Sequence, residues 1–349
     1  FFARCAADPD YALITGGAGA GGGTGLYVQE DGALVDAGGR LPADLRDGFS
    51  FQGAWLDADG DEDLDVYLVN DFGAWIDPNA LLRNQAGAFV QDAACGCELA
   101  SSGMGAAVAD FDENHVPDLF VTDIGSPTLL LGDGAGAWYD ATLARKAEVP
   151  FAPDHQSAWG AAPIDLDLDG HVDVAATYGP IEFWYPLLDV GDADGNVARA
   201  SMEQRDVFLR NRGGVYFSED ATRVGFDDTR VGRSVAVGDL DRDGRPDLVT
   251  AGWELTGEPF LRVSLAEGGC GTGVTLRGAA EDVGARVETV VAGETRVGWL
   301  LPSTTFSQSA PELIVGLGGH ETAERITVRW PGGAEESWAD VDAGAVIDL

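Results

Sequence analysis

Four short stretches of the chain place oxygen-bearing side chains at positions 1, 3, 5 and 9 of a nine-residue loop, beginning at Asp57, Asp110, Asp165 and Asp239. Ca²⁺ is a hard cation that takes six to eight oxygen ligands at about 2.3–2.6 Å, and alternate side chains of a curled loop can converge on one such ion. An EF-hand would need a bidentate glutamate at position 12, where these loops have Leu, Val, Ala and Thr. The pattern therefore predicts calcium sites of another type, each followed by an apolar strand.

The predicted metal ligands are the side chains at these four positions and the backbone carbonyl at position 7. In loop order they are Asp57, Asp59, Asp61, Asp63 and Asp65; Asp110, Asp112, Asn114, Val116 and Asp118; Asp165, Asp167, Asp169, His171 and Asp173; and Asp239, Asp241, Asp243, Arg245 and Asp247. Loops one and two have Glu62 and His115 at position 6, where a glycine would allow the sharp turn. We expect three to four Ca²⁺ ions with a structural role, because each ion neutralises acids that otherwise repel one another. Acidic surface turns that bind nothing are the alternative.

Composition restricts the partners. The 349 residues carry a formal charge of −38 at pH 7, which disfavours nucleic acid and anionic membranes because phosphate groups would be repelled. No stretch of about 18 apolar residues occurs, so membrane insertion is not expected. The 49 glycines and 45% hydrophobic residues suit a turn-rich β protein. The sequence leaves the oligomeric state open.

The four cysteines favour an oxidising compartment. An even number without a zinc-type spacing suits two disulfides. We expect Cys95 and Cys97 to bond elsewhere rather than to each other, with Cys5 and Cys270 as natural partners. Loops of this type also suit compartments where calcium is millimolar. Both points predict an extracellular or periplasmic protein.

The loops recur at spacings of 53, 55 and 74 residues, which indicates a repeat architecture. Alternating apolar residues with Gly, Asn or Asp boundaries predict four short strands in each unit, with the acidic loop between the first and second. Four-stranded units arranged around an axis form a β-propeller. The predicted strands are 51–56, 64–69, 81–84 and 88–91; 104–109, 118–122, 128–131 and 137–140; 158–164, 172–177, 207–210 and 215–218; and 234–238, 247–251 and 260–263.

Two further segments complete this picture. The N-terminal segment fits the same template without a metal loop, with strands at 1–5, 11–15 and 26–29, which gives five visible blades. The C-terminal segment predicts strands at 273–277, 286–291, 295–300, 312–315, 325–330 and 336–339. The first of these is expected to complete the fifth blade. The fold class is thus all-β, with a propeller at 1–270 and a small β-domain at 271–349.

These loops, with the runs at 64–70 and 81–89, resemble FG-GAP/VCBS repeats, the calcium-bearing blades also found in integrin α-chain propellers. The C-terminal segment resembles the ASPIC/UnbV domain of cartilage acidic protein-like proteins. The residues that carry this second resemblance are 284–287, 307–309, 316–318 and 328–333. The family implies seven blades, so the chain is either a five-bladed member or lacks N-terminal blades.

Aromatic residues gather in the turns between second and third strands, on the face opposite the calcium loops. The candidate residues for binding a ligand or partner are Trp75, Phe183, Trp184, Tyr185 and Trp253. Three of them lie in an insertion at 179–205, which also contains an acidic turn at 189–196. Trp and Tyr often dominate binding interfaces, although the insertion could instead pack on its own blade or hold a further cation.

We interpret the chain as an extracellular, calcium-stabilised binding or adhesion module that recognises a protein or glycan at the cell surface. Catalysis is not favoured, because the cluster at 154–157 holds acid, imidazole and hydroxyl groups adjacent in sequence, whereas triads converge from separate segments. No catalytic residue and no organic cofactor is therefore assigned. The alternatives are a propeller lyase or hydrolase acting on a polysaccharide, or a structural subunit of a cell-surface assembly.

Overall fold

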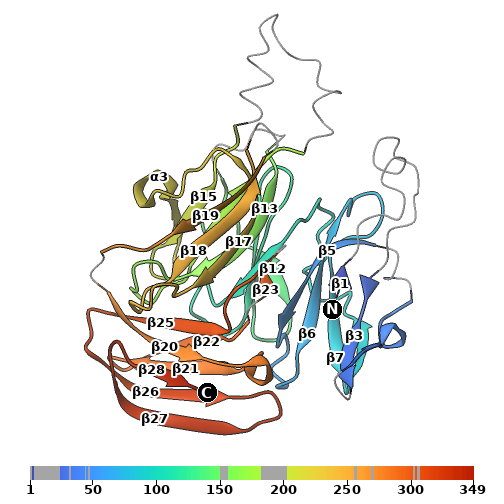
Figure 1. The fold of residues 1–349 in the computed structure, drawn as a ribbon. Helices are drawn as coiled ribbons and strands as arrows, with labels where there is room; N and C mark the ends of the chain where they lie inside the picture. The colour runs from blue at the N-terminus through green and yellow to red at the C-terminus, as the bar shows by residue number, and fades with distance from the viewer. Residues whose placement is uncertain are drawn as a thin grey trace, which may run out of the picture.

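A computed structural model describes residues 2–3, 24–30, 33–43, 45, 48–149, 156–181, 203–254, 258–268, 271–301, 303–304 and 307–349. These residues form an all-β fold with propeller-like blades and a C-terminal β-domain, as predicted. The one α-helix in the described part of the chain, α3 (Ala221–Val224), has only four residues. Figure 1 shows the blades in blue to yellow, with the C-terminal strands in orange and red stacked at one end of them.

Three blades are complete antiparallel sheets whose strands follow chain order or its reverse. They consist of β5 (Phe49–Leu56), β6 (Asp65–Asp71), β7 (Ala80–Gln85) and β8 (Ala88–Gln91); β9 (Ala106–Ala109), β10 (Asp118–Val121), β11 (Thr128–Gly132) and β12 (Trp138–Asp140); and β13 (Ala158–Ile164), β14 (Asp173–Tyr178), β15 (Val207–Asn211) and β16 (Phe217–Glu219). These strands confirm the predicted units. In each blade an acidic loop joins the first strand to the second.

The last blade differs from the prediction. Its described strands are β17 (Val231–Gly238), β18 (Asp247–Trp253) and β19 (Pro259–Ser264). The next strand, β20 (Thr272–Arg277), was expected to complete this blade but pairs instead with strands of the C-terminal domain. Its buried Val274 and Leu276 explain the difference, because both side chains enter the core of that domain.

The N-terminal segment does not form a four-stranded blade in the described residues. β1 (Phe2–Ala3) pairs with β2 (Thr24–Gly25), and β3 (Tyr27–Glu30) forms a hairpin with β4 (Ala33–Asp36). β3 confirms the strand predicted at 26–29. The strand predicted at 11–15 lies outside the described residues.

The first strands of successive blades lie next to one another: β5 contacts β9, β9 contacts β13, and β13 contacts β17. A hairpin of the C-terminal domain, β23 (Ser303–Thr304) with β24 (Ser307–Gln308), lies against these inner strands, β23 against β5, β13 and β17. Figure 1 shows β23 between the blade strands and the C-terminal strands β22 and β25. The C-terminal domain therefore contacts the first strands of the blades as well as the acidic loops.

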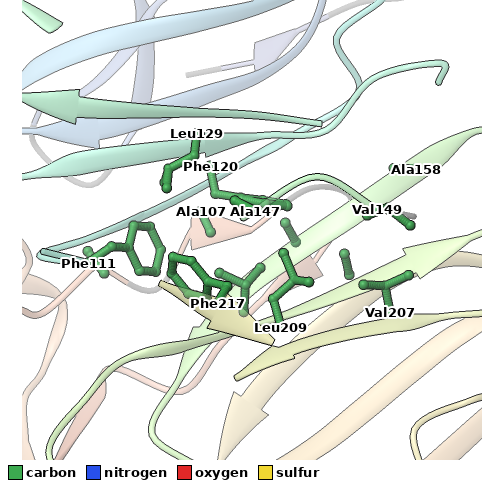
Figure 2. Packing of buried hydrophobic residues seen from close by; sticks show 14 of the residues in the cluster. Ala107, Phe111, Phe120, Leu129, Ala147, Val149, Ala158, Val207, Leu209 and Phe217 are labelled. Carbon is green, nitrogen blue, oxygen red and sulfur yellow. The ribbon is translucent and has the colours of Figure 1, made fainter. Parts of the chain in front are cut away.

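Hydrophobic side chains fill the spaces between neighbouring blades. The largest cluster joins the second and third complete blades, where Phe111 and Phe217 meet edge to face with ring centroids 6.0 Å apart. Figure 2 shows Phe120, Leu129 and Leu209 packed around them. Burial of apolar area at about 25 cal/mol per Å² makes such clusters the main stabilising contribution. Because Phe111 belongs to loop two, this core also anchors the loop.

The C-terminal domain contains two sheets. One has the order β25 (Glu312–Gly318), β20 and β28 (Val346–Asp348), with β28 parallel to β20. The other has the order β22 (Glu294–Trp299), β21 (Arg286–Val291), β26 (Thr322–Arg329) and β27 (Glu335–Asp342). The boundary predicted between residues 270 and 271 stays a prediction.

The prediction that Cys95 and Cys97 bond elsewhere is wrong. Cys95 and Cys97 bond to each other, with their Cα atoms 5.2 Å apart. Gly96 between them has φ +68° and lies against the carbonyl oxygen of Trp138, so a glycine lets this very short loop close. Cys5 and Cys270 lie outside the described residues.

Candidate metal centres

All four acidic loops are folded by the same hydrogen bonds. The carboxylate at position 1 accepts a hydrogen bond from the backbone N–H at position 6, over 3.2 Å for Asp57, 2.9 Å for Asp110, 2.8 Å for Asp165 and 3.1 Å for Asp239. The side chain at position 5 accepts one from the N–H at position 7 in every loop. Loop two, which has the poorest match to the sequence pattern, thus has the same geometry as the others.

Position 6 is left-handed in every loop, whichever residue stands there. Gly170 and Gly244 have φ +91° and +83°, and Glu62 and His115 both have φ +71°. Only glycine adopts this region without a steric cost, which is on the order of 1–3 kcal/mol for other residues. Loops one and two therefore keep the turn at the expense of backbone strain.

The aspartate at position 9 joins the loop to its blade. Asp65 Oδ2 accepts from the N–H of Ala58 at 3.0 Å, and Asp65 Oδ1 accepts from the N–H of Asn84 at 2.7 Å. Asp118 and Asp247 make the equivalent pair of hydrogen bonds, to position 2 of the loop and to the segment at or just after the end of the third strand. Sequence reasoning assigned these residues to metal binding alone and missed this second role.

Each loop gathers carboxylates closely enough to share one ion. In every loop, one oxygen from each of three aspartates lies within 4.8 Å of the other two; the groups are Asp57, Asp59 and Asp61; Asp110, Asp112 and Asp118; Asp165, Asp167 and Asp169; and Asp239, Asp241 and Asp247. The remaining predicted side chains, at Asp65, Asn114, Asp173 and Asp243, lie in the same loops. These clusters have the donor set of a hard, oxygen-preferring cation.

Burial makes several of these carboxylates costly to ionise. Asp118 is fully buried, and burial, with the nearby charge of Asp112, raises its pKa to about 8. Burial and then the charge of Asp169 raise the pKa of Asp165 to about 7. Burial raises the pKa of Asp65 and of Asp110 to about 6. A bound cation would favour the ionised forms and oppose these shifts.

Loop three holds two buried carboxylate oxygens without a hydrogen-bond partner among the described residues. Asp173 is 1% exposed, and its Oδ1 accepts from the N–H of Asn211. Its Oδ2 and the Oδ1 of Asp167 are buried and accept no hydrogen bond from any residue that the structure describes. Such orphaned oxygens are rare in native proteins and call for a partner. The residues present therefore fit a metal ion.

An arginine lies beside each acidic loop. Arg83 approaches Asp65 at 3.3 Å and Asp59 at 3.8 Å, and Arg145 approaches Asp112 at 3.0 Å. Arg210 forms an ion pair with Asp167. Beside loop four the arginine comes from the C-terminal domain, since Arg277 of β20 lies 3.9 Å from Asp239. These guanidinium groups offset part of the loop charge.

The C-terminal domain contacts the acidic loops through the residues that resemble the ASPIC/UnbV pattern. The N–H of Gly318 donates to the Leu168 carbonyl in loop three at 2.7 Å. A side chain at Gly316 would collide with the Asp165 carboxylate. Glycine at position 316 is therefore needed for close approach of the domain to the loop. Gly318 has φ +63°, a left-handed conformation that favours glycine.

Glu62 and His115, the residues that replace glycine, also face this domain. His115 Nε2 lies 3.0 Å from the carbonyl oxygen of Thr295, and Glu62 Oε1 lies 3.9 Å from Arg329 Nε. Their side chains thus make interdomain contacts that glycine could not make. These contacts could not be predicted from the sequence, because the partner residues lie about 180 or more positions away.

The aromatic candidates lie at the far ends of the strands from the acidic loops. Trp75 follows β6 and is 76% exposed, and Trp253 ends β18 and is 41% exposed. The guanidinium of Arg233 lies 5.3 Å from the Trp253 ring centroid. Phe183, Trp184 and Tyr185, like the acidic turn at 189–196, lie outside the described residues.

Profiles of known families match three parts of the chain. The family described as FG-GAP-like repeat matches residues 110–176, the FG-GAP repeat matches 231–254, and the family described as ASPIC and UnbV matches 275–349. The fold and loops thus define an FG-GAP-type β-propeller. The chain combines these repeats with a C-terminal ASPIC/UnbV domain, which confirms both resemblances.

No curated protein sequence matches the chain significantly. Similar solved structures include BBS1N in complex with ARL6DN, at 10% identity and a TM-score of 0.33, over 83% of this chain and 66% of that one. The Vibrio cholerae biofilm matrix protein Bap1 has 11% identity and a TM-score of 0.29, over 88% and 49% of the two chains. The Photorhabdus luminescens Tc holotoxin pore has 12% identity and a TM-score of 0.28, over 87% and 13%. The chain thus spans less than two thirds of these proteins, and similarities of this size carry no information about activity.

Proposed function

We propose that the chain is a calcium-stabilised β-propeller that acts as an extracellular or periplasmic binding module. The proposal is supported first by the four loops, which share the same hydrogen bonds and each bring oxygens of three aspartates close together. In loop three, buried carboxylate oxygens also have no hydrogen-bond partner among the described residues. Three to four Ca²⁺ ions would be held by the twenty residues predicted from the sequence. Calcium is favoured over Mg²⁺ because an all-protein set of oxygen ligands in a flexible loop suits the larger ion.

When bound, calcium would supply positive charge that neutralises the clustered carboxylates. The protein's own residues fold the loop and attach it to the blade. Position 1 folds the loop through its hydrogen bonds to N–H groups, and position 9 fixes the loop to its blade. The ion would thereby connect the first and second strands of a blade. Stabilisation of this kind amounts to about 2.7 kcal/mol per site at a calcium concentration of 100 times Kd.

The face opposite the acidic loops is the proposed recognition surface. Trp75 and Trp253 support this role, because exposed tryptophans at loop tips are common anchors in interfaces. The partner would be a protein or glycan at the cell surface. Among the described residues, no helix is long and apolar enough to cross a lipid bilayer.

The test is thermal unfolding of the full chain in EDTA and in millimolar CaCl₂, with the bound metal counted by mass spectrometry. We expect Tm to rise with calcium and three or four ions per chain. Asp167→Asn should remove one ion, because Asp167 contributes to the loop-three cluster. Asp133→Asn is the matched control, since Asp133 lies in an exposed turn outside the acidic loops. No bound calcium, or equal loss of metal in both variants, would refute the proposal.

A further inference from the structure

A cavity of about 330 Å³ lies between the first acidic loop and the C-terminal domain. Pockets that bury small ligands begin at about 300 Å³ and combine apolar walls with a few placed polar groups. Here loop one supplies Asp59, Glu62 and Asp63, and the neighbouring loop two supplies His115. The opposite wall comes from the C-terminal domain and includes Arg286, Glu288, Trp299, Arg329 and Trp330.

Contacts between the two domains define the shape of this cavity. Leu64 of loop one lies so close to Gly284 that any side chain there would overlap it. Glu62 and His115 reach across to Arg329 and to the backbone of Thr295. Because these contacts come from both domains, the cavity is formed only when the C-terminal domain is seated on the loops.

Both arginines of the cavity are already paired with a carboxylate. Arg286 donates to Glu288 and thereby lowers the pKa of that carboxyl. Arg329 donates to Glu335 at 2.8 Å. The arginines therefore offer no uncompensated positive charge for an anion, while the acids of loop one repel it. Calcium in loop one would offset two of the negative charges on that wall, which leaves the lining close to neutral and favours an uncharged ligand.

The polar groups nevertheless include both donors and acceptors. The guanidinium groups of Arg286 and Arg329 have more N–H donors than their partners use, and Glu62 and Glu288 have free acceptor capacity. A ligand that meets both kinds of group must donate and accept hydrogen bonds, as hydroxyl groups do. Trp299 and Trp330 add apolar walls, and Trp330 is held in place by the hydrogen bond from its Nε1 to Asp282 at 2.7 Å.

We propose that this cavity binds a neutral sugar residue, with its hydroxyl groups on Glu62, Glu288 and Arg286 and its apolar face against Trp299 or Trp330. This inference rests on the proposed calcium in loop one, which would offset part of the negative charge of one wall. It places a carbohydrate site on the same face as the acidic loops, opposite the surface that carries Trp75.

The experiment uses the full chain with calcium and a panel of neutral methyl glycosides, followed by tryptophan fluorescence and saturation-transfer NMR. We expect at least one glycoside to bind with a Kd of about 1 mM or tighter, corresponding to roughly −4 kcal/mol. Glu288→Gln should weaken binding at least tenfold, because the substitution removes the charge that orients Arg286. Leu261→Ala, at an exposed side chain of β19 outside the cavity, is the matched control and should leave the Kd unchanged. A matched oligosaccharide that binds tighter than its terminal methyl glycoside identifies a glycan chain, and equal Kd values identify a single terminal sugar.

Metal content measured on the same samples separates the two proposals. A chain with its full calcium complement that binds no glycoside would overturn the sugar site and leave the calcium proposal intact. Binding that Trp75→Ala abolishes and Glu288→Gln preserves would also overturn it, because the sugar would then lie on the other face. Trp330→Leu, which removes one wall, gives a second variant in case Glu288→Gln disturbs folding; we expect it to weaken binding by a similar factor.

Discussion

Removal of calcium should reverse the way in which the stability of this protein depends on pH. Asp118 and Asp165 are 0% and 8% exposed, and burial raises their pKa values to about 8 and about 7. In the unfolded chain an aspartate titrates near pH 3.9. Between roughly pH 4 and pH 7 the folded, metal-free protein therefore binds more protons than the unfolded chain. Its free energy of unfolding must then fall as pH rises.

The size of the effect follows from the number of protons. Each extra proton bound by the folded state changes the free energy of unfolding by about 1.4 kcal/mol per pH unit, so Asp118 and Asp165 together contribute at most about 3 kcal/mol per unit. Asp65 and Asp110 add to this below about pH 6. Arg145 lies beside loop two, and local relaxation lowers the cost of ionisation further, so we expect on the order of 1 kcal/mol per unit. This corresponds to a shift of a few degrees in Tm per pH unit.

The assay is scanning calorimetry from about pH 5 to about pH 7.5, in EDTA and in excess CaCl₂. In EDTA, Tm should rise on acidification. In calcium it should fall, because protons compete with the ion for the same oxygens. Asp118→Asn should flatten the EDTA curve. If Tm in EDTA falls on acidification as steeply as in calcium, the buried carboxylates do not carry the cost assigned to them.

Two further predictions concern single side chains. The double substitution Glu62→Gly and His115→Gly should relieve about 1 kcal/mol or more of backbone strain per site and leave the number of bound calcium ions unchanged. Amide hydrogen exchange in β22 should become faster, because the contact between His115 and Thr295 is lost. Unchanged exchange would contradict this prediction. Trp138→Ala should cost about 3–5 kcal/mol in urea unfolding, because Trp138 is 4% exposed. Trp75→Ala should change the free energy of unfolding by no more than about 0.5 kcal/mol, because Trp75 is 76% exposed. Equal destabilisation by the two substitutions would show that the burial assigned to Trp138 and the exposure assigned to Trp75 are wrong.

The parts of the structure that short sequence spacing determines were predictable. Alternation at positions 1, 3, 5 and 9 of each loop places the aspartates around one centre, and an apolar run after the loop specifies the second strand. For the same reason the strand units of the three complete blades followed from the sequence, with boundaries shifted by a few residues. Loop two could also be predicted as an acidic loop of this type, although Asn114 and His115 depart from the pattern.

The features that sequence reasoning missed depend on distant contacts. β20 has the alternation of a blade strand, and only its pairing with β25 and β28 places it in the C-terminal domain. The Cys95–Cys97 bond depends on the left-handed backbone of Gly96 rather than on cysteine number. The cavity beside loop one was also unpredictable, because loop one lies more than 200 residues from the C-terminal wall in the chain.

The seating of the C-terminal domain on the acidic loops has a consequence for biosynthesis. Chains fold from the N-terminus as they are made, at about 5–20 residues per second. The blades are therefore synthesised before the strands that cover their loops. A metal ion that reaches loop three during this interval meets an open loop, whereas one that arrives later must pass the seated domain, because Gly316 and Gly318 lie against that loop. Ion exchange at loop three in the mature protein should consequently be slower than ion capture by the nascent chain.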